Sequence, residues 1–225
     1  MIPEVDSSRN LWKTLLRVAW LAIVVGCALE LLLLAVAGGF GALHGLKPFI
    51  ADLTQKISWS VIVCVGIAVG SAASKARDVA MGVLGFISAP VGFYAARAIH
   101  KGVAQALAVA SQAPGTSAFM VALVKAIEYG VFGLALYWIQ KRSWGVAGHV
   151  MVAVSIGGVF GAIVLVLTKG ATPLPLAALV SREINEIFFP VGCALVIYST
   201  EVLKKRHTPA VETAALPAAA QRSGA

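Results

Sequence analysis

The residues best suited to chemistry are charged side chains that lie inside long apolar runs. Lys125 and Glu128 share one such run, at the i, i+3 spacing that brings side chains together on one face of a helix. Glu30 lies inside another run. A charge in hydrocarbon costs about 3 kcal/mol even on the lenient insertion scale, so these groups require partners, water or a function. Buried carboxylates of this kind are typical of cation and proton paths.

The spacing of Lys125 and Glu128 supports two interpretations. In the first, the two side chains form a self-contained ion pair that lets their helix insert into a membrane. In the second, Lys125 pairs with Glu30 or Glu186, which leaves Glu128 as a protonatable carboxylate in a cation or proton path. The first interpretation needs fewer assumptions, and both stay open.

A second polar group opens the last apolar run and consists of Arg182, Glu183, Asn185 and Glu186. Glu186 follows Arg182 at i+4, so an arginine flanked by two carboxylates is geometrically reachable. Acidic residues in the first turn of a helix also complement its dipole, which is the simpler explanation. The functional alternative is a polar vestibule that faces outward. Pro190 is expected to bend this helix and to free a backbone carbonyl near Glu186.

The composition indicates that a membrane is the solvent of these helices. Of the 225 residues, 59% are hydrophobic and only 12% are charged, and the mean hydropathy is +0.88. Such a chain has too little polar surface to cover a soluble globule. The net charge of +8 comes from Lys and Arg residues that are scattered between apolar runs. This distribution favours a membrane surface and argues against nucleic acid as the partner.

Apolar runs and turn signals predict an all-α bundle of about six transmembrane helices. The predicted spans are 18–37, 57–70, 79–98, 117–139, 146–167 and 181–206. We expect them to form a single membrane domain over 1–206, followed by a disordered cytoplasmic tail over 207–225. Polar residues and glycines predict a connection before the second span, with a short interfacial helix over 49–53, and a longer connection over 100–116.

Lys and Arg are more frequent on one side of these spans than on the other. With the N-terminus inside, the inner face holds Arg9, Lys13, Arg17, Lys75, Arg77, Lys141, Arg142, Lys204, Lys205, Arg206 and Arg222, and the remaining basic residues are Lys47, Lys56, Arg97, Lys101, Lys125, Lys169 and Arg182. The positive-inside rule therefore predicts that both termini are cytoplasmic. We expect the plasma membrane as the location, and a bacterial inner membrane in particular.

Two pairs of glycines have the GxxxG spacing that lets helix backbones approach closely, Gly66 with Gly70 and Gly157 with Gly161. Packing inside the bundle is the simpler interpretation, and a homo-oligomeric face is the alternative. The sequence contains no GxSxG, HExxH or Walker loop, and its Cys and His residues lack metal-ligand spacing. We therefore expect no metal, no cofactor and no enzymatic activity.

These features favour a small transporter or channel for an ion or a small polar solute. The residues expected to line its polar path are Glu30, Lys125, Glu128, Arg182, Glu183, Asn185 and Glu186. One alternative is a non-catalytic subunit or assembly factor of a larger membrane complex, and another is an intramembrane enzyme that modifies lipids. The expected partners are membrane lipids and either a second copy of the chain or a neighbouring membrane subunit.

Overall fold

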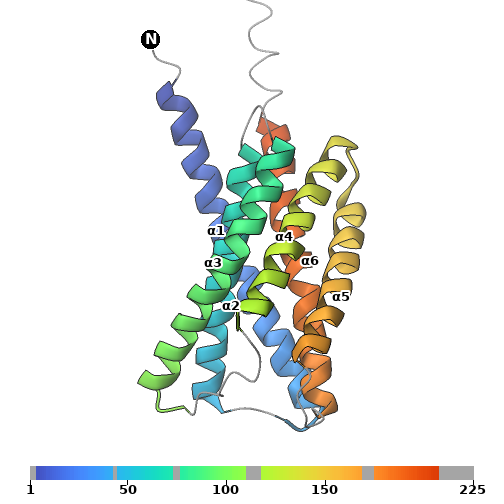
Figure 1. The fold of residues 1–225 in the computed structure, drawn as a ribbon. Helices are drawn as coiled ribbons and strands as arrows, with labels where there is room; N and C mark the ends of the chain where they lie inside the picture. The colour runs from blue at the N-terminus through green and yellow to red at the C-terminus, as the bar shows by residue number, and fades with distance from the viewer. Residues whose placement is uncertain (1–3, 43–44, 73–76, 110–117, 169–174, 208–225) are drawn as a thin grey trace, which may run out of the picture.

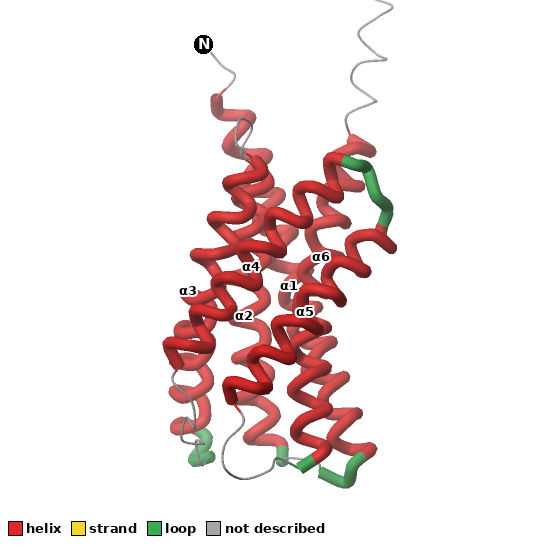
Figure 2. The backbone as a smooth tube through the Cα atoms, turned by 45° about the vertical axis from the view of Figure 1, so that its right-hand side comes forward, coloured by secondary structure: helices red, strands yellow, loops and turns green. Residues whose placement is uncertain are grey.

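The described residues form six helices that are each long and apolar enough to cross a membrane. The structure is a computed structural model, and it describes residues 4–42, 45–72, 77–109, 118–168 and 175–207. The helices are α1 (Glu4–Gly39), α2 (Leu46–Ala72), α3 (Arg77–Ala106), α4 (Ala118–Lys141), α5 (Val146–Thr168) and α6 (Leu176–His207). Figure 2 shows that the described segments between them are short loops. The predicted all-α class with six apolar helices is confirmed.

The helices form a ring in which each helix packs against the next one along the chain. α6 closes the ring by packing against α1, and it also contacts α2 across the interior. The first turns of α1 and the last turns of α6 lie at the same end of the bundle (Figure 1). We call the half of the bundle at this end the terminal half and the opposite half the distal half.

Three of these helices end in the same backbone conformation. Gly41, Ala108 and Ser143 follow α1, α3 and α4 with φ angles of 69°, 54° and 53°. The N–H of the next residue donates a hydrogen bond to the carbonyl oxygen five residues before it, as from Ala42 N to Ala37 O at 2.8 Å. A left-handed residue of this kind satisfies the last carbonyls of a helix and stops it.

Several helices extend beyond the predicted spans, because polar residues interrupt hydropathy without ending a helix. α2 begins at Leu46, so the segment 49–53 is part of its first turns and the prediction of a separate interfacial helix is wrong. Pro48 is tolerated there because a first-turn N–H has no partner inside its helix. α3 continues to Ala106, so the predicted connection over 100–116 begins as helix.

The two outermost helices are also longer than predicted. α1 is already helical from Glu4, and α6 from Leu176. Pro190 lies inside α6, which continues past it to His207. The predicted disordered tail lies outside the described residues from position 208 onward.

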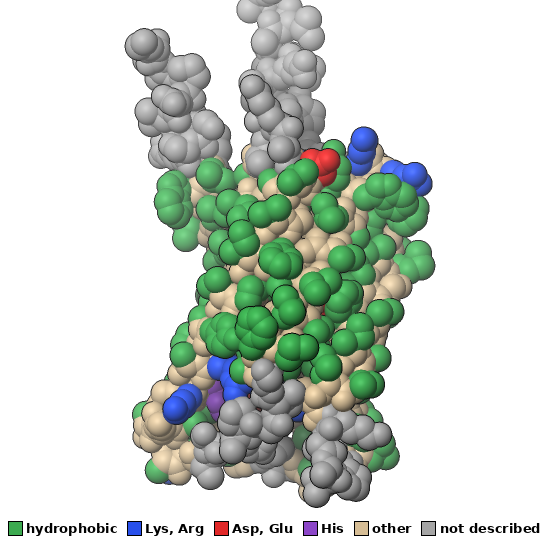
Figure 3. All heavy atoms as spheres, in the orientation of Figure 1, with side chains coloured by type: hydrophobic (Ala, Val, Ile, Leu, Met, Phe, Trp, Pro, Cys, Tyr) green, Lys and Arg blue, Asp and Glu red, His purple; other side chains and the backbone are tan. Residues whose placement is uncertain are grey.

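The outer surface of the bundle is apolar over its middle. Large hydrophobic side chains such as Trp20, Phe86 and Val159 are exposed there. On the face shown in Figure 3, hydrophobic side chains cover the middle, and charged and histidine side chains lie toward the two ends. At the terminal end, the guanidinium of Arg142 lies 3.9 Å from the ring centroid of Trp138. Aromatic and basic residues at the ends of apolar helices are typical of a membrane interface.

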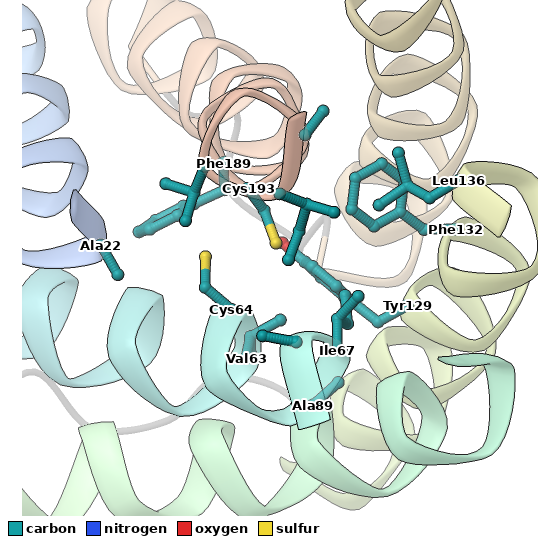
Figure 4. Packing of buried hydrophobic residues seen from close by; sticks show 14 of the residues in the cluster. Ala22, Val63, Cys64, Ile67, Ala89, Tyr129, Phe132, Leu136, Phe189 and Cys193 are labelled. Atoms are coloured by element: carbon teal, nitrogen blue, oxygen red, sulfur yellow. The ribbon is translucent and has the colours of Figure 1, made fainter. Parts of the chain in front are cut away.

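A layer of aromatic side chains fills the centre of the ring. Trp59 of α2 makes edge-to-face contacts with Tyr129 of α4 and with Phe189 of α6, with ring centroids 5.6 Å and 6.2 Å apart. We call these three residues the aromatic layer. The thiols of Cys64 and Cys193 face each other beside it (Figure 4). On the side of the layer toward the terminal half, the interior is filled mainly by apolar side chains, among them Val63, Ile67, Phe132, Leu136 and Ile197.

Candidate functional site

Three charged side chains meet inside the distal half, between α4 and α6. Lys125 Nζ donates one hydrogen bond to Glu128 Oε2 at 2.7 Å and a second to Glu186 Oε2. The side chains of Lys125, Glu128 and Glu186 are 9%, 0% and 9% exposed. We call these three residues the charged triad.

The position of Glu186 follows from small residues on α5. A Cβ atom added to Gly161 would lie 2.8 Å from Glu186 Cβ, and one added to Gly157 would lie 2.8 Å from the carbonyl oxygen of Glu186. The GxxxG pair therefore lets this turn of α6 pack directly on the backbone of α5. Pro190 has no N–H to donate to the carbonyl of Glu186. The oxygen left without its helical partner is thus the one that packs on Gly157.

The triad contains two carboxylates but only one ammonium group, so its formal charges do not balance. Within the described residues, Glu128 Oε1 is buried without a hydrogen-bond partner, and so are Glu183 Oε2 and Asn185 Oδ1. An unpartnered carboxylate oxygen in an apolar interior costs free energy unless it binds a proton, a cation or water. All three unpartnered atoms are acceptors, which suits the site to a positively charged guest.

A separate cavity of about 190 Å³ lies between α1, α2 and α6 in the distal half. Its polar lining consists of Glu30, Asp52, Lys56 and Ser181, and the rest of its lining is apolar. Glu30 is buried, with 6% of its surface exposed. Asp52 Oδ1 lies 3.1 Å from His100 Nε2 of α3. We call this space the distal cavity.

The structure combines the two interpretations of Lys125 that the sequence leaves open. The local pair with Glu128 is formed, and the long-range pair with Glu186 is formed as well. Glu30 lies apart from this group, in the lining of the distal cavity, and Glu128 is not part of that lining. The expected path residues therefore fall into two neighbouring places within the distal half.

Arg182 does not form the cluster with carboxylates that its spacing makes geometrically reachable. Its Nη1 donates to Thr168 Oγ1 at the end of α5, at 2.6 Å, and within the described residues it makes no ion pair with Glu183 or Glu186. The reason is that Glu186 points to Lys125, whereas Glu183 lies against α5. A Cβ atom added to Gly161 would lie 2.9 Å from Glu183 Oε1.

The other GxxxG pair lies at the contact between α2 and α3. A Cβ atom added to Gly70 would lie 2.7 Å from Met81 Cα, and one added to Gly66 would lie 2.5 Å from Ser88 Cβ. Both glycine pairs thus face neighbouring helices of the same chain, which is the internal packing that small residues allow in membranes.

Three residues that line the distal cavity are missing from the set predicted from sequence, namely Asp52, Lys56 and Ser181. Hydropathy alone assigns the first to a connection, because charged residues interrupt the apolar run there. Helical periodicity is the signal that identifies them. Asp52 and Lys56 are four residues apart, as are Ser181 and Asn185, so each pair lies on one helix face.

The terminal half contains a polar cluster of a different kind. Arg77 Nη2 donates to Glu201 Oε1 at 2.5 Å and to Gln140 Oε1 at 2.8 Å. The side chains of Arg77 and Glu201 are 34% and 18% exposed. One cation here meets one carboxylate and a neutral amide, so the formal charges balance.

No model of a known protein family, no curated protein and no solved structure matches this chain. Among the described residues, no group of three or more His, Cys, Asp or Glu side chains is placed to hold a metal ion. The charged triad and the distal cavity are therefore the features of the molecule that bear on its function.

Proposed function

We propose that this membrane protein is a small transporter or channel for an ion or a small polar solute. The observation that supports it most is the charged triad, in which Lys125 holds two buried carboxylates and Glu128 keeps an unpartnered oxygen. A structural ion pair needs only one carboxylate. The second brings an excess negative charge into an apolar interior, where it is costly and is typically retained for function.

The proposed path enters the distal half and ends at the aromatic layer. Lys125 Nζ lies 5.9 Å from the ring centroid of Tyr129, so the triad sits directly on this layer. Beyond it, the interior next to the layer is filled by apolar side chains, and the buried imidazole of His149 lies farther toward the terminal end. Hydrophobic constrictions close membrane paths by excluding water. Displacement of Trp59, Tyr129 and Phe189 from one another is the opening step that we propose.

We further propose that both ends of the chain face the cytoplasm and that the protein lies in the plasma membrane, with a bacterial inner membrane as the first choice. Basic residues in the terminal half, such as Arg17, Arg77 and Arg142, support this orientation by the positive-inside rule. The distal half, with its triad and cavity, then opens to the outside.

Flux in proteoliposomes tests this proposal. Glu128→Gln keeps the shape of the side chain but removes the excess charge, and we expect it to abolish flux of the transported ion or solute while insertion stays intact. Glu201→Gln is the matched control, because it changes the same residue type in the terminal half. Unchanged flux in the Glu128 variant would rule out a role for the triad in transport.

One observation favours a second candidate, a subunit of a larger membrane complex. The first turns of α1 stand apart from the other helices (Figure 1), and Trp12, Leu16 and Trp20 are exposed there. Extraction in mild detergent separates the two candidates, since a homogeneous species without a co-purifying protein counts against the subunit.

A further inference from the structure

We infer that the ion moved by this protein is the proton, and that His149 of α5 is a proton-binding site in the terminal half, across the aromatic layer from the charged triad. The inference rests on the proposed function and deepens it by naming the ion and a second site on its path. Three observations carry it: the burial of His149, the hydrogen bond that fixes its ring, and the chemistry that its unpartnered nitrogen shares with Glu128.

His149 is a buried imidazole near the start of α5. Only 1% of its surface is exposed, and the centroid of its ring lies 5.0 Å from that of Tyr198 on α6. Its Nδ1 atom lies 3.0 Å from the carbonyl oxygen of Gly145. A carbonyl oxygen can only accept a hydrogen bond, so Nδ1 carries the proton of the neutral ring. Nε2 is then unprotonated and presents a lone pair.

The lone pair of Nε2 is buried without a hydrogen bond. Among the described residues, this atom has no hydrogen-bond partner, and neither does Oε1 of Glu128 in the triad. An unpartnered acceptor in an apolar interior costs free energy. The protein thus keeps one costly acceptor on each side of the aromatic layer, as is typical of groups that bind a guest during part of a working cycle.

The two acceptors together select the proton among positively charged guests. Carboxylate oxygens bind protons and hard metal cations alike, whereas an imidazole nitrogen binds protons and transition metals such as Zn²⁺ and Cu²⁺. A transition-metal ion needs several such ligands, and within the described residues no group of three or more His, Cys, Asp or Glu side chains can hold one. The proton suits both Glu128 and His149, because it needs only one lone pair at each.

The titratable residues around His149 come from the two helices that pack against α5, since α5 contains no other charged residue. Glu201 of α6 is bound to Arg77 and so is already paired. Imidazole is the side-chain type that ordinarily exchanges its proton near neutral pH, so His149 is the group suited to proton exchange here. Its titratable neighbours near this level are Tyr137 and Lys141 of α4 and Tyr198 and Glu201 of α6.

The triad and His149 are too far apart for direct proton transfer. Glu186 of the triad and Tyr198, which contacts His149, are twelve residues apart on α6, which corresponds to about 18 Å at about 1.5 Å per residue. Apolar side chains such as Phe132 and Leu136 fill most of the interior between them. A proton moves only between groups in hydrogen-bond reach or through water. Opening of the aromatic layer would therefore have to admit water between the two sites.

Solid-state NMR of the full chain in lipid vesicles, with isotope-labelled histidine nitrogens, tests the inference at equilibrium. The nitrogen chemical shifts report which ring atoms carry a proton, and the signal of His149 is the one lost in His149→Asn. We expect a neutral ring protonated at Nδ1 in alkali and a ring protonated at both nitrogens in acid. A neutral ring protonated at Nε2, or one that takes up no second proton while the protein stays folded, would overturn the inference.

Proton flux into proteoliposomes that contain a pH-sensitive dye shows whether this site lies on the path. A positioned proton acceptor typically changes a rate about a hundredfold or more, so we expect His149→Asn to lower proton flux at least tenfold. Asparagine can still donate to Gly145 but has no counterpart of Nε2, and His149→Gln is a second variant if the first fails to fold. His207→Asn, at the end of α6, is the matched control and should leave flux unchanged. Full proton flux in a folded His149 variant would overturn the inference.

The inference and the proposed function fail in different ways, because protonation is measured at equilibrium and needs no transport. Flux of sodium or of a polar solute that depends on Glu128 but not on His149 would overturn the inference alone. Uptake of the second proton by His149 without flux of any ion or solute would overturn the proposed function and leave the proton-binding site in place.

Discussion

Arg77 in the terminal half and Lys125 in the distal half each hold two side-chain oxygens, but their surroundings differ. Arg77 binds the carboxylate of Glu201 and the amide oxygen of Gln140, whereas Lys125 binds two carboxylates. Arg77 is 34% exposed and Lys125 only 9%. The terminal cluster is therefore balanced in formal charge and partly exposed, whereas the triad is unbalanced in formal charge and buried.

The buried atoms without a hydrogen-bond partner also differ between the two clusters. Among the described residues, those of the terminal cluster are the donors Arg77 Nε and Gln140 Nε2, whereas that of the triad is the acceptor Glu128 Oε1. Both donors belong to a cluster whose formal charges balance. A buried acceptor with excess negative charge is instead suited to a positive guest. What separates a structural from a functional cluster here is its charge balance and depth, since both contain similar residue types.

Removal of the cation should change the free energy of unfolding much more in the triad than in the terminal cluster. Lys125→Met leaves two buried carboxylates without a cation, and loss of one member of a buried ion pair costs about 3–5 kcal/mol. Arg77→Met should cost about 1 kcal/mol or less, as for partly exposed pairs. Free energies of unfolding from detergent titrations measure both changes.

A triple variant tests whether the unpaired negative charges cause this loss of stability. Replacing Glu128 and Glu186 with Gln in the Lys125→Met background should recover most of the lost stability. Equal losses for Lys125→Met and Arg77→Met would contradict the distinction between the two clusters.

The glycines of α5 provide the next test, because they position the acidic turn of the distal half. Gly161→Ala places a Cβ atom 2.8 Å from Glu186 Cβ, and overpacking of this kind costs about 1–3 kcal/mol. Gly158→Ala is the matched control, since a Cβ atom there meets nothing within 4 Å. We expect lower stability and lower flux for the first variant only. The same result for both alanines would show that helix propensity, and not packing on α6, is what changes.

The aromatic layer should keep water-soluble reagents in the distal half from reaching the terminal half. Cys64 and Cys193 follow Trp59 on α2 and Phe189 on α6, on the terminal side of the layer, and are buried. In a Cys27→Ala background, a charged methanethiosulfonate should therefore modify neither. Trp59→Leu opens space in the layer and should let the reagent reach Cys64. Phe86→Leu changes an exposed aromatic residue and should not. Mass spectrometry of the intact protein counts the adducts, and rapid labelling of the unaltered layer would argue against closure there.

Much of the fold follows from the sequence, because lipid requires each span to satisfy its own backbone and so favours long apolar helices. The ends of the helices do not follow from hydropathy. Asp52 and His100 lower the local hydropathy, yet they contact each other between α2 and α3. A polar residue that faces a partner inside the bundle costs little, and hydropathy cannot tell it from one in a loop.

The site was only partly predictable for a related reason. The spacing of Lys125 and Glu128 predicts their contact, because i, i+3 neighbours meet on any helix. The contact with Glu186 depends on how α5 positions α6, through Gly157, Gly161 and the free carbonyl beside Pro190. Such long-range packing has no local signature. The same holds for Glu30, whose neighbours come from α2 and α6.

The most direct test of the central claim makes the distal cluster resemble the terminal one. Glu128→Gln leaves Lys125 with one carboxylate and one amide, as Arg77 has with Glu201 and Gln140. The measurement is the transient current of proteoliposomes on a solid-supported membrane after a rapid jump in proton or sodium concentration. We expect wild type and Glu201→Gln to give a transient and Glu128→Gln to give none, although it unfolds no more easily than wild type. A wild-type transient from folded Glu128→Gln would contradict the claim that this excess charge serves transport.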